Sequence, residues 1–185
     1  NNSTLLGNTT RILSDAPTGG GTSDIYNVTT ATTINSITGI DLEFGATGTY
    51  PDGELVLTRI NQRPDVIPGD SPVAKAYWII NNYGTNQTFD ALTSMTFDDT
   101  GLLTAYSTAT DFPLSSRPEN DFGLNWVELA TSNSINQPNK TITFDQNLTV
   151  GSFGQFTLEH KTARGWIGVD NTEWKNEFNW GGGIV

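Results

Sequence analysis

The sequence predicts an all-β fold, an antiparallel sandwich of roughly nine or ten strands. Short runs rich in Thr, Ile, Val and aromatic residues alternate with clusters of Gly, Asn, Asp and Pro through the 185 residues. Such runs favour strands, and such clusters favour turns. No stretch beyond about ten residues keeps the 3.6-residue helical period, so we expect no helix longer than about two turns. This pattern is typical of immunoglobulin-like or jelly-roll-like sandwiches.

The stretch from Ala74 to Phe97 organises the predicted fold as two strands and their connection. Residues 74–81 include the consecutive apolar residues Tyr-Trp-Ile-Ile, so both faces of this strand are apolar, as in a central strand. Residues 81–86, Asn-Asn-Tyr-Gly-Thr-Asn, tolerate turn and left-handed conformations. Residues 89–97 then resume a strand pattern.

Shorter strands surround this pair. Alternating or β-branched runs predict strands at residues 25–34, 37–44, 54–60, 102–108, 126–131, 140–144 and 153–158. Proline-containing polar stretches predict long loops at residues 63–72 and 110–125. The side chains that we expect to be largely buried are Trp78, Ile80, Leu92, Phe97, Val127, Leu129, Phe144 and Phe156.

Composition divides the chain into three parts. Residues 1–24 are polar, contain the break Gly19-Gly20-Gly21, and are expected to form an N-terminal strand or linker. Residues 25–159 are the predicted sandwich module. Residues 160–185 begin with a polar, basic segment that holds the only histidine, His160, and continue with three Trp and several Gly. This tail is too short for a core of its own, so we interpret it as an exposed linker and the start of a following repeat.

Charge and cysteine content exclude several classes of function. Nine Lys and Arg against twenty Asp and Glu give a net charge of −11, which argues against binding to nucleic acid. The chain has no cysteine, which excludes thiolate metal sites and cysteine nucleophiles. No run approaches the roughly 20 apolar residues of a membrane-spanning helix. Without a start residue or a signal peptide, the chain is interpreted as an internal piece of a longer mature protein.

Five segments, in order, resemble a β-sandwich module of very large secreted proteins of the Bacteroidetes, exported by the type IX secretion system. They are Ile37–Phe44 with Leu57-Thr58-Arg59, then Ala76–Ile80, Ala91–Phe97, Trp126–Leu129 with Lys140–Phe144, and Gly151–Leu158. Lys75-Ala76 stand where that module usually has an Arg. The tail, with Trp166-Ile167-Gly168, Trp174, Asn179-Trp180 and Gly183-Ile184-Val185, is similar to a motif that opens the next repeat.

The resemblance implies a non-catalytic spacer, stalk or adhesin segment that is extracellular or on the cell surface. Its expected partners are neighbouring domains of the same polypeptide or adjacent copies of the chain. An accessory module that binds extracellular glycans is the alternative function. The sequence offers little for catalysis, because a Ser-His-Asp arrangement would have to use His160 and no G-x-S-x-G motif occurs.

Two acidic clusters are candidate calcium ligands, namely Asp98 with Asp99, and Glu119 with Asp121. Ca²⁺ takes six to eight oxygen ligands from carboxylates, carbonyls and water. The alternative for the first cluster is structural, because Asp98-Asp99-Thr100-Gly101 also suits a hairpin turn.

Three aromatic side chains are candidates for stacking on sugar rings, Tyr83, Tyr106 and Trp126. They could bind carbohydrate only if they point outward. The alternative for all three is packing in the core or between modules.

Overall fold

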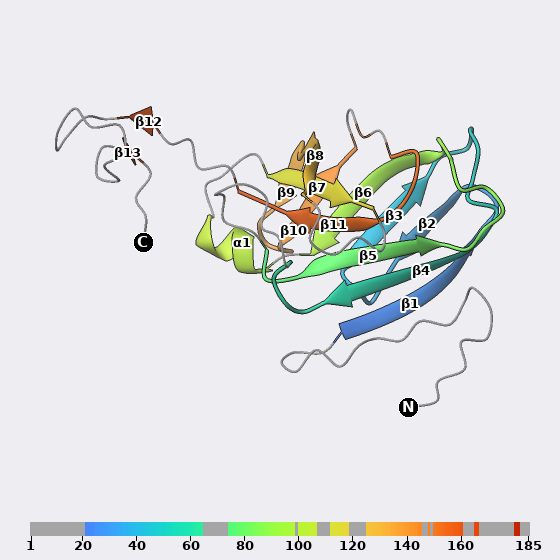
Figure 1. Ribbon diagram of the computed structural model, residues 1–185, viewed down its shortest axis with the longest axis horizontal. Coiled ribbons are helices and arrows are strands. Elements are labelled where there is room, and N and C mark those ends of the chain that lie inside the picture. Colours follow the sequence, from blue (N-terminus) through green and yellow to red (C-terminus); the bar gives the residue numbers. More distant parts are fainter. Residues whose placement is uncertain are drawn as a thin grey trace.

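The structure, a computed structural model, describes residues 21–64, 74–98, 100–106, 112–118, 125–145, 148, 150–160, 165–166 and 180–181. Two antiparallel sheets pack against each other, which confirms the predicted all-β sandwich (Figure 1). The six-stranded sheet has the order β1 (Gly21–Val28), β4 (Gly53–Ile60), β5 (Tyr77–Asn82), β11 (Gln155–Leu158), β7 (Pro113–Arg117) and β8 (Val127–Thr131). The five-stranded sheet has the order β2 (Thr32–Asn35), β3 (Ile40–Phe44), β6 (Leu92–Asp98), β10 (Thr141–Phe144) and β9 (Ser134–Asn136).

The chain moves between the two sheets repeatedly. The antiparallel pairs β4–β5 and β7–β8 belong to the six-stranded sheet, whereas β2–β3 and β9–β10 belong to the five-stranded sheet. A single strand joins the two pairs in each sheet: β11 lies between β5 and β7, and β6 lies between β3 and β10. The organising strands β5 and β6 therefore lie in different sheets, and residues 83–91 cross between the sheets.

Alternation of side chains places the core between the sheets. In β6, Leu92, Met95 and Phe97 are buried, and in β10, Ile142 and Phe144 are buried. Six of the eight side chains predicted to be buried are buried: Trp78, Ile80, Leu92, Phe97, Phe144 and Phe156. The other two lie on β8, an edge strand, where Val127 is 65% exposed and Leu129 is half-buried. That prediction was wrong because an edge strand has a neighbour on one side only.

Three local predictions were wrong. The expected strand 25–34 is two strands in different sheets, β1, which already begins at Gly21, and β2. The chain bends between them at Thr29–Ala31, whose small side chains are exposed. The expected strand 102–108 instead belongs in part to a helix, α1 (Thr100–Ala105). Leu102 and Leu103 are adjacent and both buried, which a helical turn permits but strict strand alternation does not.

The expected loop 110–125 contains β7, a buried strand. Its polar residues find buried partners: Arg117 donates from Nε and from a terminal nitrogen to Gln155 Oε1, at 2.9 and 2.8 Å, and Ser115 donates to Glu159. The helix α1 is too short to cross a membrane, and no other helix of the described residues is long and apolar enough to do so. In the tail, β12 (Gly165–Trp166) and β13 (Trp180–Gly181) pair with each other.

Candidate functional site

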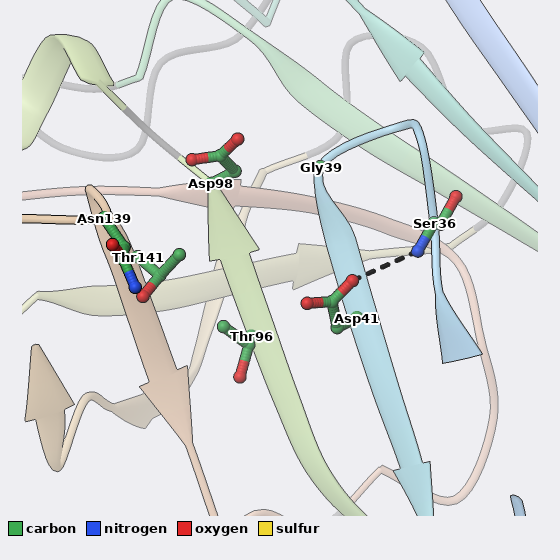
Figure 2. A pocket seen from close by; sticks show the side chains of 7 residues that line it. All are labelled: Ser36, Gly39, Asp41, Thr96, Asp98, Asn139 and Thr141. Atoms are coloured by element: carbon green, nitrogen blue, oxygen red, sulfur yellow. Dashed lines mark hydrogen bonds between the residues drawn. The ribbon is translucent and has the colours of Figure 1, made fainter. Parts of the chain in front are cut away.

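A polar pocket lies on the outer face of the five-stranded sheet, at the end of β3, β6 and β10 (Figure 2). Strand register brings its walls together: Asp41 of β3 lies opposite Thr96 of β6, and Asp98 of β6 lies opposite Thr141 of β10. Because alternate residues of a strand share a face, Thr96 and Asp98 both point away from the core. The pocket has a volume of about 210 Å³ and is lined by Ser36, Gly39, Asp41, Thr96, Asp98, Asn139 and Thr141.

The turn between β2 and β3 forms one wall of the pocket. The Gly39 N–H donates to the Ser36 carbonyl at 3.0 Å, and the Ser36 N–H donates to the Asp41 carboxylate at 3.1 Å. Gly39 has a φ of 72°, in the left-handed region. A Cβ there would lie 2.8 Å from the Arg59 guanidinium and 3.1 Å from Cβ of Asp98. Glycine therefore allows this turn to approach β6 closely.

The pocket contains two carboxylates, and the Arg59 guanidinium lies near it. Burial raises the pKa of Asp41, the Ser36 N–H acts in the opposite direction, and the charge of Asp98 raises it further. The Arg59 guanidinium donates to the Asp98 carbonyl over a long 3.5 Å and lies 5.3 Å from the centre of the Trp78 ring.

These oxygen atoms suit a hydrated cation better than a tightly held calcium ion. Two carboxylates, one amide and three hydroxyls converge on the pocket, and hard cations prefer such donors. Asp41, however, already accepts a backbone N–H, and its burial disfavours the charged form, so that its pKa is raised. Among the described residues, no group of three or more His, Cys, Asp and Glu could hold a metal.

The predicted calcium cluster is only partly described. Asp98 ends β6 and faces Asp41 across the pocket, whereas Asp99, Glu119 and Asp121 lie outside the described residues. Calcium binding therefore stays a prediction. The alternative of a hairpin turn after Asp98 is wrong, because α1 begins at Thr100.

The candidate sugar-binding aromatics do not form one surface. Trp126 is only 8% exposed, and the Arg117 guanidinium lies 4.4 Å from the centre of its ring. Tyr106 is half-buried and stacks on His160 with 3.8 Å between ring centroids. His160 is therefore packed against the sandwich, contrary to the expectation of an exposed linker histidine. Tyr83 is half-buried and follows β5, at the opposite end of the six-stranded sheet from His160.

The pocket residues other than Asp98 were missed from the sequence. The available signal was the alternation in Ile40–Phe44 and Leu92–Asp98, which places Asp and Thr at outward positions. Asp41 and Asp98 are far apart in the chain, and only the β3–β6 register brings them into one pocket.

Comparison of the chain with known protein families, with curated proteins and with solved structures finds no match. The resemblance to a Bacteroidetes module therefore stays a prediction from its motifs.

Proposed function

We propose that this chain is a non-catalytic structural module of a long extracellular or cell-surface protein, in which it serves as a projecting spacer or adhesin segment. One observation carries the proposal: most aromatic side chains of the described residues are buried, and their ring contacts join the two sheets into one core. No aromatic side chain of the described residues with known exposure is fully exposed.

Aromatic contacts cross the core at both ends of the sandwich. Trp78 of β5 contacts Phe97 of β6 with ring centroids 4.9 Å apart, and Phe97 contacts Phe144 of β10 at 5.8 Å. The Trp78 indole N–H also donates to the Thr38 carbonyl at 2.9 Å, linking the sheets by a buried hydrogen bond. Such edge-on ring pairs contribute beyond their buried area. This cross-linking favours a rigid body over an adaptable binding cleft.

A second set of rings closes the other end of the core. Phe89 lies 4.5 Å from Phe153 and 6.4 Å from Phe44, measured between ring centroids. Phe153 in turn contacts Phe156 of β11 at 6.5 Å. These rings join β3 of one sheet to β11 of the other, so both ends of the sandwich are held.

The first and the last strand of the sandwich connect to the rest of the chain at the same end of the six-stranded sheet. Gly21, at the start of β1, pairs with Ile60, which pairs with Tyr77. The antiparallel pairing of β11 with β5 places Leu158 at the same end. The first and last strands are three strand spacings apart, about 14 Å. The opposite end of the six-stranded sheet is therefore a tip, distant from both connections.

The tip, defined as residues 50–53 and 84–86, is tightly hydrogen-bonded. The Thr85 and Asn86 N–H groups donate to the Asp52 and Pro51 carbonyls, both at 3.0 Å. The Asn86 side chain donates to the Tyr50 carbonyl at 2.9 Å. A rigid tip that lies far from both connections of the sandwich suits a spacer or adhesin segment.

A carbohydrate-binding accessory module is the second candidate function. The observation in its favour is the pocket, whose carboxylates, amide and hydroxyls could hydrogen-bond to sugar hydroxyls. No aromatic residue lines that pocket.

Two measurements test the proposal. An antibody against the chain should label intact cells of the source organism, and labelling only after lysis would contradict an extracellular location. On a glycan array, the full chain should show no signal above background. Binding that is lost in Asp98→Asn, and kept in the matched control Glu43→Gln on the exposed outer face of β3, would establish the carbohydrate-binding alternative instead.

A further inference from the structure

Among the described residues, no strand pairs with the outer side of β1, and this edge differs from the other three edges of the two packed sheets. The edge strands β2 and β9 have four and three residues, and β8 has five residues with a register shift in its pairing with β7. β1 has eight residues and pairs with β4 in unbroken register (Figure 1). Proteins protect long edges with Lys, Pro or bulges. β1, Gly-Thr-Ser-Asp-Ile-Tyr-Asn-Val, has none of these.

The only charge on β1, that of Asp24, satisfies one backbone N–H of the edge. The Asp24 carboxylate accepts hydrogen bonds from the Tyr26 hydroxyl at 2.6 Å, the Ile25 N–H at 3.0 Å and the Ser36 hydroxyl at 3.3 Å. Burial acts to raise the pKa of Asp24, but these bonds and one from the Ile37 backbone outweigh it, so that this pKa lies below its usual value. Asp24 therefore stays ionised and held by its own neighbours.

Apolar side chains are exposed around the same strand. Ile25 is 56% exposed and Ile37 is 76% exposed; with Val127, they are the exposed large hydrophobic residues of the described chain. Ile25 lies beside the buried Val56 on the outer face of the sheet. The turn that carries Ile37 is held beside β1 by the bond from Ser36 to Asp24. Exposed apolar side chains beside a strand edge that no described strand pairs with mark an interaction surface.

We propose that β1 pairs antiparallel with β1 of a second copy of this chain, about a two-fold axis at Ile25. The two six-stranded sheets would then form one continuous sheet across the pair. The inference does not depend on the proposed extracellular role, because it follows from the edge alone.

Side-chain chemistry selects the register. In a two-fold antiparallel pair, each residue on the axis lies opposite its own copy, and opposite residues share a face. The middle of β1 lies between Asp24 and Ile25, so a pair that uses the whole strand is centred on Asp24 or on Ile25. The first would oppose two carboxylates. The second places the two exposed Ile25 side chains together, Asp24 opposite Tyr26, and Ser23 opposite Asn27.

Backbone geometry agrees with this register. The Ile25 N–H donates to a side chain, the Asp24 carboxylate, so it faces away from β4. Since N–H and C=O groups alternate in direction, Ser23, Ile25 and Asn27 turn theirs to the free edge. In the Ile25-centred register these residues oppose one another and can exchange about six hydrogen bonds. Asp24 would release the Ile25 N–H and keep its bonds from Tyr26 and Ser36.

Sedimentation of the full chain tests the proposal. A single strand edge is a small interface, so we expect a reversible dimer at protein concentrations of roughly 0.1–1 mM. Ile25→Lys places two like charges opposite each other and should weaken dimerisation at least about tenfold. Val127→Lys is the matched control: it also replaces a β-branched apolar residue by Lys, at a 65% exposed position on the other edge of the same sheet.

A monomer at about 1 mM, or equal effects of the two Lys variants, would overturn the proposal.

Single-cysteine variants test the register separately, since the chain has no other cysteine. Opposed Ile25→Cys residues would have Cα atoms about 5.5 Å apart, which suits a disulfide. Asn27→Cys residues would be about 13 Å out of register and should not cross-link. Rapid cross-linking of Ile25→Cys alone supports the Ile25-centred pair. Equal rates for the two variants, or cross-linking of Asn27→Cys alone, would refute it.

Discussion

The buried hydrogen bond from Trp78 to Thr38 should contribute measurably to the stability of the sandwich. Trp78 is fully buried, and its indole N–H donates to the Thr38 carbonyl at 2.9 Å. Trp78→Phe removes the donor and leaves a buried carbonyl without this partner, at a cost of about 1–3 kcal/mol. The smaller ring also leaves a cavity beside Phe97, at a further cost of about 1–2 kcal/mol. We expect a total loss of about 2–5 kcal/mol in the free energy of unfolding.

Trp126→Phe provides a matched control. Trp126 is 8% exposed, so it too is nearly buried, but its indole nitrogen has no hydrogen-bond partner among the described residues. The same substitution there removes no bond and removes an unpaired buried N–H. Its cost should stay below about 1 kcal/mol, because a phenyl ring still offers a face to the Arg117 guanidinium.

Urea unfolding, followed by circular dichroism, measures both variants against the unmodified chain. The unfolding midpoint should fall further for Trp78→Phe, with an unchanged slope. The reasoning is refuted if Trp126→Phe costs as much as Trp78→Phe, because the hydrogen bond between the sheets would then contribute nothing.

Four further predictions follow from particular contacts. Burial raises the pKa of Asp41, so the folded chain binds this proton more tightly and stability falls as pH rises through the titration. Urea unfolding between about pH 3 and pH 7 measures this decrease in the free energy of unfolding, and Asp41→Asn should remove the part that comes from Asp41. That part should be less than about 1 kcal/mol, because the carboxyl is partly exposed, and a steeper decrease in the variant would contradict the prediction. Gly84→Ala should cost about 1–3 kcal/mol, because its Cβ would lie 2.0 Å from the Pro51 carbonyl oxygen. Gly151→Ala is the control, because its Cβ would meet only the Phe89 carbonyl oxygen at 4.0 Å, and it should be close to neutral. Thermal melts compare the two variants, and equal losses of stability would argue against a packed tip. Deletion of residues 161–185 should change the free energy of unfolding by less than about 1 kcal/mol, since β12 and β13 pair only with each other, and loss of folding would show that the tail completes the core. If a loop calcium site exists, EDTA should lower the melting temperature and added calcium should restore it, whereas identical melts would exclude a stabilising ion.

Local patterns in the sequence determined the fold class and most of the strands. The apolar run around Trp78 and the alternation in Ile40–Phe44 and Thr141–Phe144 place side chains on defined faces whatever the surroundings. The period of a strand is a property of the backbone, so such segments can be recognised without their partners.

The tertiary structure decided the elements and sites whose partners are distant in sequence. β7 is hidden in a polar stretch because Arg117 and Ser115 are satisfied by Gln155 and Glu159 of the segment that forms the last strand of the sandwich. Trp126 is buried because the Arg117 guanidinium covers its ring.

The candidate sites depend on the same long-range pairing. Asp41 and Asp98 share a pocket only through the β3–β6 register. β1 is an edge strand because β4 pairs with one of its sides and no described strand pairs with the other. Composition and periodicity describe a residue's own segment, whereas burial, pairing and edges depend on which segments become neighbours.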